Sequence, residues 1–374
     1  MSDIADLSKG IGISKDQLSA DGEPCILYGE LYTKYKSETI KEVISKTNID
    51  NTKLVKSKAN DVIIPCSGET AEEIATARCV LKDDILLGGD LNIIRLHGYD
   101  GSFMSYQLNG KRKYDIAKVA QGVSVVHLYG EHLKNIKTIN PSLNEQKKIA
   151  NLLSLLDERI STQNKIIDKL QSLIKGINQE VFNDVGYSYK LGSICEIKSG
   201  YSGNQLIKKE GLKVSRIETI SGHRINLKRV GYVSPFKNSE SYKLQVGDIL
   251  FSNINSVEYI GNTAFVDKDY DLYHGMNLLR LIPNSKIVVP FYLYLLLNTR
   301  KMLNRFKTIC NKAVSQASIN QTDLGKTIIV LPSLENHIKI CTIYEVLFSK
   351  IEAEKNCLSL YNVQKQYLLR QMFI

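Results

Sequence analysis

The 374-residue sequence has no apolar run long enough to cross a membrane. Its first residues, MSDIADLSKG, also lack the basic segment and apolar core of a secretory signal peptide. Hydrophobic residues make up 43% of the chain and charged residues 24%, which is the balance of a globular protein. These features exclude an integral membrane protein and predict a cytoplasmic protein with no membrane partner.

Cysteine and histidine are sparse and show no metal-ligand spacing. The seven cysteines are odd in number and scattered, with no Cys-x-x-Cys pair. They support neither a zinc site nor a disulfide framework, and they fit a reducing cytoplasm. The six histidines are His97, His127, His132, His223, His274 and His337. We therefore predict no metal site and expect structural or solvent-facing histidines.

Motifs of common catalytic sites are absent as well. No Gly-x-x-x-x-Gly-Lys-Ser/Thr phosphate loop occurs, and Gly10-Ile-Gly12 lacks the third glycine of a dinucleotide fingerprint. None of the seven prolines is followed by aspartate, as the Pro-Asp element of a nuclease site requires. Asn140-Pro-Ser-Leu143 lacks the second proline and the aromatic residue of an amino-methyltransferase motif. We predict no catalytic residue in this chain.

Positive charge is abundant but unevenly placed. The formal net charge is +10. Residues 183–331 hold 20 Lys+Arg against 11 Asp+Glu, whereas residues 1–140 hold 18 against 19. A basic globular segment favours a polyanionic partner, usually nucleic acid.

One long stretch occurs twice and organises the chain. The first copy starts at Pro141 with PSLNEQKKIANLLSLLDERIS, and the second starts 191 residues later with PSLENHIKICTIYEVLFSKIE. Apolar residues recur in steps of three and four, which predicts a long helix packed on another long helix. The first predicted seam is Ile149, Leu153, Leu156, Ile160, Ile167, Leu170, Ile174, Ile177 and Val181. The second is Ile340, Tyr344, Leu347, Ile351, Leu358, Tyr361, Leu368 and Met372.

Polar residues interrupt both seams at matching places. Gln163 stands in the first seam, and Glu354, its partner at the offset of 191, stands in the second together with Lys365. A polar residue in a seam costs stability but can fix the register of the pair.

The start of each helix carries a capping signal. Ser142 and Glu145 have the spacing of a capping box. The second copy keeps Ser333 but has Asn336-His337 where the first has Glu-Gln, so its capping box is predicted to be weaker.

The globular segments repeat too. Met1 to Gly10 has the pattern of Leu191 to Gly200. Other matching stretches are 60–64 with 246–250 and 90–96 with 275–281. These short runs of Val, Ile and Tyr, bounded by Gly, Asn and Asp, predict strands and turns. We also expect strand character just before Pro141 and Pro332, and a helix over 291–307.

The order of segments predicts the architecture. Globular and helical segments alternate as 1–140, 141–182, 183–331 and 332–374, with a linker at 183–190. The simplest packing sets the two helices antiparallel with their seams facing each other. We predict an α+β protein with two α/β domains separated by two long antiparallel coiled-coil helices, related by a pseudo-two-fold internal repeat.

Basic and polar clusters interleaved with tyrosine occur in both globular segments. Arg and Lys suit guanine edges and phosphates, and Asn and Gln suit adenine. The candidate DNA-binding residues of the first segment are Lys34, Lys36, Lys111, Arg112 and Lys113. Those of the second are Arg216, Arg224, Asn226, Lys228, Arg229, Asn253, Asn255, Lys312, Ser315, Gln316 and Asn320. One such cluster is more often a solvated loop, and their recurrence is what favours DNA binding.

With these features the sequence resembles the DNA-specificity (S) subunit of type I restriction-modification enzymes. The most specific stretch is Pro141-Ser-Leu-Asn-Glu-Gln-Lys-Lys-Ile-Ala150, followed by Leu-Leu-Asp157 and Ile160. Gly122 to Tyr129 resembles the end of a target-recognition domain of that family, and Leu191 to Gly200 resembles the opening of one. The second helix departs from the family pattern at Asn336-His337.

The resemblance implies two target-recognition domains, each reading half of a split site in double-stranded DNA. It implies that the helices form a spacer and dock two methyltransferase (M) subunits, which bind S-adenosylmethionine and methylate adenine. Restriction (R) subunits, where present, would add ATP- and Mg²⁺-dependent translocation and cleavage. The chain itself would bind no cofactor and catalyse nothing.

Two other functions remain open on the sequence. A self-contained DNA-modifying enzyme would methylate or cut DNA as a purified chain. A coiled-coil scaffold would fail to bind duplex DNA even with its partner subunits present.

Overall fold

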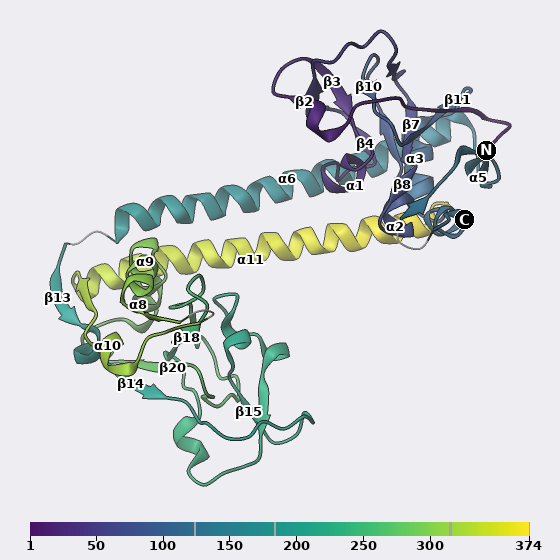
Figure 1. Cartoon of the computed structure of the whole chain (residues 1–374). Helices are drawn as coiled ribbons and strands as arrows, with labels where there is room; N and C mark the ends of the chain where they lie inside the picture. Colours follow the sequence, from purple (N-terminus) through teal and green to yellow (C-terminus); the bar gives the residue numbers. More distant parts are fainter. Residues whose placement is uncertain (123–124, 183–184, 314–315, 374) are drawn as a thin grey trace. The chain divides into compact units, whose positions relative to one another are not determined.

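The computed structural model describes residues 1–122, 125–182, 185–313 and 316–373 (Figure 1). The chain forms two compact units, here called the first unit (residues 1–168 and 353–374) and the second unit (residues 169–352). Two helices contribute to both units, α6 (Leu143–Val181) and α11 (Leu334–Gln371). They have 39 and 38 residues, so each is roughly 60 Å long at 1.5 Å per residue.

The predicted seams are the buried faces of these helices. Leu153, Leu156 and Ile167 of α6 are buried, as are Tyr344 and Ile351 of α11. The remaining predicted seam residues are half-buried. Because every predicted seam position faces protein, the seams drawn from the sequence are confirmed.

The helices run antiparallel wherever they touch within a unit. In the first unit Gln163 hydrogen-bonds to Glu354. In the second unit the hydroxyl of Tyr344 hydrogen-bonds to Asn178. In the first unit Asp157 also pairs with Lys365, so the α11 partner's number falls from 365 to 354 as the α6 number rises from 157 to 163. This is the antiparallel pairing expected from the sequence.

A serine side chain caps the start of each long helix, as the sequence predicts. The N–H of Glu145 donates to Ser142 Oγ at 3.4 Å, and the N–H of Ser142 donates to Glu145 Oε2 at 3.1 Å. The hydroxyl of Ser142 also donates to the Glu145 carboxylate at 2.7 Å. The bonds from this hydroxyl and from the Ser142 N–H hold the pKa of Glu145 below its usual value. In the second copy the N–H of Asn336 donates to Ser333 Oγ at 3.4 Å.

The first unit contains two five-stranded sheets. One has the order β1-β11-β7-β9-β4 and the other β2-β5-β3-β10-β6. Their strands are β1 (Ala5–Lys9), β2 (Leu18–Ser19), β3 (Glu23–Ile26), β4 (Thr39–Ile40), β5 (Ser45–Thr47), β6 (Val55–Lys56), β7 (Asp61–Pro65), β9 (Arg78–Val80), β10 (Leu86–Leu87) and β11 (Leu91–Leu96). A two-stranded sheet joins β8 (Ser67–Gly68) to β12 (Val126–His127). The helices are α1 (Glu30–Thr33), α2 (Ala71–Ile74), α3 (Gly101–Asn109), α4 (Lys113–Val119) and α5 (Gly130–Lys134).

The core of the first unit follows from strand alternation. In β7, Ile63 packs into one cluster of buried side chains, whereas Val62 and Ile64 belong to another. Both faces of this central strand are therefore covered, as a continuous apolar run predicts. Met104 and Leu108 of α3 complete the second of these clusters.

The second unit repeats this plan with smaller sheets. A four-stranded sheet has the order β14-β20-β17-β19, and a three-stranded sheet has the order β18-β22-β21. Two further sheets pair β13 with β23 and β15 with β16. The strands are β13 (Tyr187–Lys190), β14 (Cys195–Ser199), β15 (Leu212–Val214), β16 (Gly231–Val233), β17 (Ile249–Phe251), β18 (Ile254–Asn255), β19 (Thr263–Phe265), β20 (Leu279–Pro283), β21 (Asn311–Lys312), β22 (Ala317–Ser318) and β23 (Ile328–Leu331). The helices are α7 (Leu191–Ile194), α8 (Pro290–Leu297), α9 (Arg300–Ile309), α10 (Gln321–Gly325) and the 3-10 turns η2 (Ile217–Ile220), η3 (Leu227–Arg229) and η4 (Ser239–Tyr242).

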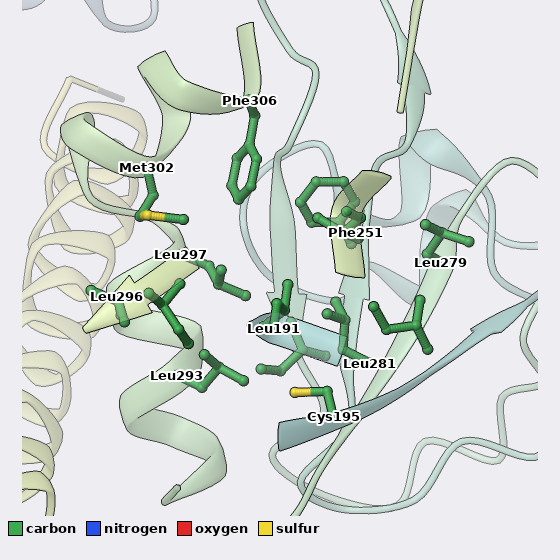
Figure 2. Close-up of a cluster of buried hydrophobic side chains, with 14 of the residues drawn as sticks. Leu191, Cys195, Phe251, Leu279, Leu281, Leu293, Leu296, Leu297, Met302 and Phe306 are labelled. Carbon is green, nitrogen blue, oxygen red and sulfur yellow. The ribbon is translucent and has the colours of Figure 1, made fainter. Parts of the chain in front are cut away.

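Figure 2 shows the core of the second unit, where side chains of α8 and α9 point toward the four-stranded sheet. Leu293 and Leu297 lie near Leu281, and Phe306 packs edge-on against Phe251 with ring centroids 5.0 Å apart. Helix α8 is apolar on all sides and α9 is amphipathic, and together they cover one face of the sheet.

The internal repeat is visible in the strand order. β1-β11-β7-β9 in the first unit corresponds to β14-β20-β17-β19 in the second, and all these pairs are antiparallel. The repeat predicted from the sequence is thus confirmed in both fold and topology.

Three local predictions need correction. Residues 135–141 form no strand, whereas β23 does precede the second helix. The predicted linker 183–190 includes β13, which pairs with β23 and so belongs to a sheet. The helix expected over 291–307 is two helices, since α8 ends at Leu297 and α9 begins at Arg300. Thr299 caps α9, because its hydroxyl accepts the N–H of Met302 at 3.3 Å.

Candidate nucleic-acid interface

An Asp–Arg pair with a buried carboxylate recurs in the main sheet of each unit. In the first unit Arg95 of β11 donates two bonds to Asp61 of β7, at 2.9 and 2.7 Å. In the second, Arg280 of β20 lies 2.6 Å from Asp248, which precedes β17. Burial raises the pKa of Asp248, and the N–H of Gln245 and the Arg280 guanidinium oppose that rise. These pairs fix neighbouring strands and serve the scaffold beneath the candidate surfaces.

The amide-rich candidates of the second unit gather on one small sheet. Asn255 of β18 pairs with Ala317 of β22, and Lys312 of β21 pairs with the same residue. Gln316 immediately precedes β22, and Asn320 is the second residue after the strand. Lys312, Gln316 and Asn320 are exposed. The structure therefore brings together Asn255 and Asn320, which are 65 positions apart in the sequence.

Some of these amides also have structural roles. Asn320 caps α10 by accepting the N–H of Asp323 at 2.8 Å. The N–H of Ile319 donates to the backbone oxygen of Asn253 at 2.9 Å, and the Asn253 amide donates back to Ile319 O at 3.3 Å. Ser315 lies outside the described residues. Lys312 and Gln316 are thus the candidates whose described surroundings leave the side chain most open to a ligand.

Helix α9 adds a basic surface that leads directly into this sheet. It carries Arg300, Lys301, Arg305 and Lys307 and no acidic residue. Cations in the first turn of a helix oppose its dipole, at a cost of about 0.3–1 kcal/mol each. Basic residues in the first turn of α9 disfavour the helix, and residues that disfavour their own local structure often have a functional role. The acid-free run from Arg300 to Lys312 is a sign of this basic surface in the sequence, although the prediction for residues 291–307 is only of a helix.

A second cluster of candidates surrounds the 3-10 turns η2 and η3. Arg216, Arg224, Lys228 and Arg229 are exposed or half-exposed, and Asn226 caps η3 by accepting the N–H of Lys228 at 3.0 Å. Arg224 is also 2.9 Å from Glu352 of α11, a contact within the second unit. A hollow of about 930 Å³ opens between this cluster and α11, lined among others by Phe291, Tyr294 and Phe348.

The candidates of the first unit fall into two separate places. Lys34 and Lys36 line a hollow of about 730 Å³ bounded by α6 and α11, and Lys34 is bonded to Glu30. Lys111 and Arg112 lie between α3 and α4, and Lys113 is the first residue of α4. Burial lowers the pKa of Lys113, and Arg112 pairs with Asp115 at 3.3 Å. Neither group forms a surface comparable to the amide-rich sheet of the second unit.

Other kinds of site are not found in the part of the chain that the structure describes. No group of three or more His, Cys, Asp or Glu residues there could hold a metal ion. No described helix is long and apolar enough to cross a membrane. All seven cysteines are free thiols and six are buried.

The fold defines a class of protein: two related α/β units that share a pair of long helices, with a basic and amide-rich surface on the second unit. The family model for the type I restriction modification DNA specificity domain matches residues 1–172 and again 186–359. The chain belongs to this family. Specificity subunits are DNA-recognition components of type I restriction-modification systems rather than catalytic enzymes.

Individual relatives agree with this assignment. A Methanocaldococcus jannaschii protein, provisionally named the type I restriction enzyme MjaX specificity subunit, is 40% identical over 180 residues. That match covers 47% of this chain and 42% of the relative, so the chain spans less than half of that protein. The EcoKI specificity subunit of Escherichia coli K12 is 20% identical over 406 residues, covering 100% of this chain and 87% of its own length.

Solved structures show the same fold. The S subunit of a type I system from M. genitalium superimposes with a TM-score of 0.64 at 18% identity, covering 100% of this chain and 94% of its own. A second structure, from a study of type I complex assembly and conformational transition, has a TM-score of 0.59 at 17% identity and covers 98% and 95%. The resemblance and the α+β fold class predicted from the sequence are confirmed.

Proposed function

We propose that this chain directs a type I restriction-modification complex to a bipartite site in double-stranded DNA. Residues 1–140 and 183–331 serve as the two target-recognition domains, and residues 141–182 and 332–374 serve as the spacer helices. The observation that carries the proposal is the family match to each half of the chain. The acid-free basic helix and the polar sheet of the second unit support DNA as the ligand.

A repeated exposed apolar surface supports docking of two copies of one partner. Leu152 and Leu155 of α6 are each 49% exposed, and their counterparts 191 residues later, Ile343 and Val346 of α11, are 47% and 64% exposed. Leu143 and Leu334 form a third pair of exposed counterparts. Packing between the helices explains why apolar residues recur in the seam. It does not explain why exposed apolar residues recur at equivalent positions of the two helices. Two equal apolar patches fit two methyltransferase subunits.

The chemistry belongs to those partners. The family implies no catalytic cofactor for this chain. The methyltransferase subunits would bind S-adenosylmethionine and methylate adenine, and two restriction subunits, where present, would use ATP and Mg²⁺. The complex would work in the cytoplasm, where its DNA substrate lies.

The test is to express the chain with its methyltransferase subunit and map adenine methylation across the host genome. The proposal predicts one methylated motif made of two short specific parts separated by unspecified bases, and it predicts no such methylation when either protein is omitted. A purified chain that methylates or cuts DNA alone would instead favour a self-contained enzyme. Failure of the complex to bind duplex DNA would favour a scaffold.

A further inference from the structure

We propose that His127, Tyr129 and Lys9 form the base-reading surface of the first recognition domain, in place of the lysine clusters suggested by the sequence. This inference rests on the proposed function. It concerns which residues of the first unit contact one half of the DNA site.

Strand register identifies this surface. In the second unit β22 alternates buried Ala317 and Ile319 with the more exposed Ser318 and Asn320. In the first unit β12 and the residues after it repeat that alternation as Val126 and Leu128 buried, His127 and Tyr129 exposed. The offset is again 191, so Tyr129 stands where Asn320 stands and His127 where Ser318 stands.

Hydrogen bonds confirm that the two sheets are equivalent. The N–H of Leu128 donates to Cys66 O at 2.8 Å, as the N–H of Ile319 donates to Asn253 O at 2.9 Å. Val126 pairs with Gly68 of β8, just as Ala317 pairs with Asn255 of β18. The β8–β12 sheet is therefore the first unit's copy of the amide-rich sheet.

The side chains on this copy form an exposed aromatic cluster that includes one lysine. The rings of His127 and Tyr129 stack with centroids 6.1 Å apart and planes 18° from parallel. Lys9 Nζ lies 5.4 Å from the centre of the Tyr129 ring, and His132 packs edge-on against that ring at 5.5 Å. Of the nearby acidic residues, Glu131 of α5 is paired with Lys134 at 2.6 Å, and Asp90 accepts from the hydroxyl of Ser67, the strand partner of His127, at 3.2 Å. Tyr129 is 46% exposed.

Such a cluster can do what DNA recognition requires. A tyrosine hydroxyl and an imidazole can donate to or accept from base edges, and a lysine can contact guanine or phosphate. The second unit presents amides at the same positions, which suit adenine. The two halves of the site would then be read by different chemistry on the same strand framework.

A matched control exists within the same unit. Tyr114 of α4 is 68% exposed, and Lys118 Nζ lies 4.4 Å from the centre of its ring. It has the same local chemistry as Tyr129 but lies outside the β8–β12 sheet. Tyr129→Ala and Tyr114→Ala should therefore cost similar, small amounts of folding stability, and they should differ only in their effect on recognition.

The experiment maps methylation in cells that express the full chain with its methyltransferase subunit, for the wild type, Tyr129→Ala, His127→Ala and Tyr114→Ala. In Tyr129→Ala and His127→Ala we expect base discrimination to fall by about fivefold or more at positions in one half of the motif only. Tyr114→Ala should keep the wild-type motif. Tyr129→Phe, which retains the ring, should lose less than Tyr129→Ala if stacking contributes.

Two results would overturn the inference: a folded Tyr129→Ala chain with an unchanged motif, or equal relaxation of both halves. Both leave the proposed function standing, because the wild type would still methylate a bipartite motif. If the wild-type complex produces no bipartite motif, it is the proposed function that fails.

Discussion

Gln163 and Glu354 are counterparts in the repeat, and they touch each other. The Gln163 amide donates to the backbone oxygen of Glu354 at 3.3 Å and also bonds to its carboxylate. In a two-fold pairing, if residue i of one copy contacts residue j of the other, then j of the first contacts i of the second. Equivalent residues therefore contact each other only where the pairing is centred. The polar residues that break the two seams thus satisfy each other at the point where the repeats face.

This contact predicts strong coupling between the two positions. Gln163→Leu alone should destabilise the chain by about 1 kcal/mol, because it removes the hydrogen bonds that the buried Gln163 amide donates to Glu354. Combining it with Glu354→Leu should recover most of that loss, since two matched apolar residues can replace a polar pair. A double-mutant cycle from urea unfolding measures the coupling, and purely additive effects would contradict the assignment.

Lys365, the other polar residue in a seam, has a different explanation. Its ammonium lies 2.6 Å from Asp157 of α6 and also pairs with Glu38 of the first unit. Burial raises the pKa of Asp157, but Lys365 and hydrogen bonds from Ser37 and Tyr106 outweigh it and leave that pKa below its usual value. The charged cluster fastens the first globular segment to both helices within that unit.

Lys365→Met should therefore destabilise the first unit by about 3–5 kcal/mol, because it removes the cation that contacts both buried carboxylates directly. The control is Lys339→Met, which removes an exposed lysine 2.7 Å from Glu335 and should cost at most about 0.5 kcal/mol. Chemical denaturation of the two variants makes the comparison. Equal, small losses would show that the buried cluster contributes little.

His337 predicts a pH dependence of stability. Its side chain is fully buried and stacks on Tyr292 with centroids 4.0 Å apart, and among the described residues neither ring nitrogen has a hydrogen-bond partner. Burial lowers its pKa to about 4 from an ordinary value near 6.5. The unfolded chain therefore binds this proton more readily, so stability is complete above pH 6.5 and falls as the pH drops toward 4.

His337→Gln should reduce that loss by up to about 3 kcal/mol between pH 6.5 and 4, since glutamine does not titrate. Glutamine also stands at the equivalent first-copy position, Gln146, which is buried. Urea unfolding at the two pH values provides the measurement, with the exposed His127→Gln as control. An unchanged pH dependence in His337→Gln would refute the assignment.

The repeated apolar patches predict partner stoichiometry. Leu152→Asp should remove one methyltransferase subunit from the complex and Ile343→Asp the other, because each places a charge on an apolar contact surface. Leu173→Asp is the control, since Leu173 is also 49% exposed but has Gln364 as its counterpart. Native mass spectrometry should show one bound subunit for each single variant and two for the control. Two bound subunits in both single variants would place the docking surface elsewhere.

The sequence predicted what depends on local periodicity. The positions of Leu153 and Tyr344 in the seams follow from spacing alone, and so does the capping by Ser142. It could not predict that Lys365 meets Glu38, because that contact joins residues 327 positions apart. The repeat offset of 191 relates Tyr129 to Asn320 in the sequence, but the two side chains differ, and only the strand pairing shows that they occupy equivalent places in the two sheets.

The central claim is that each unit reads one half of the DNA site. The most direct measurement replaces residues 1–140 with the corresponding segment of another specificity subunit and maps methylation by the resulting complex. Since Glu38 contacts Lys365, the donor segment should supply a carboxylate there. The account predicts a motif in which one half is new and the other half is unchanged. A motif in which both halves change, from a chain that folds and assembles normally, would contradict it.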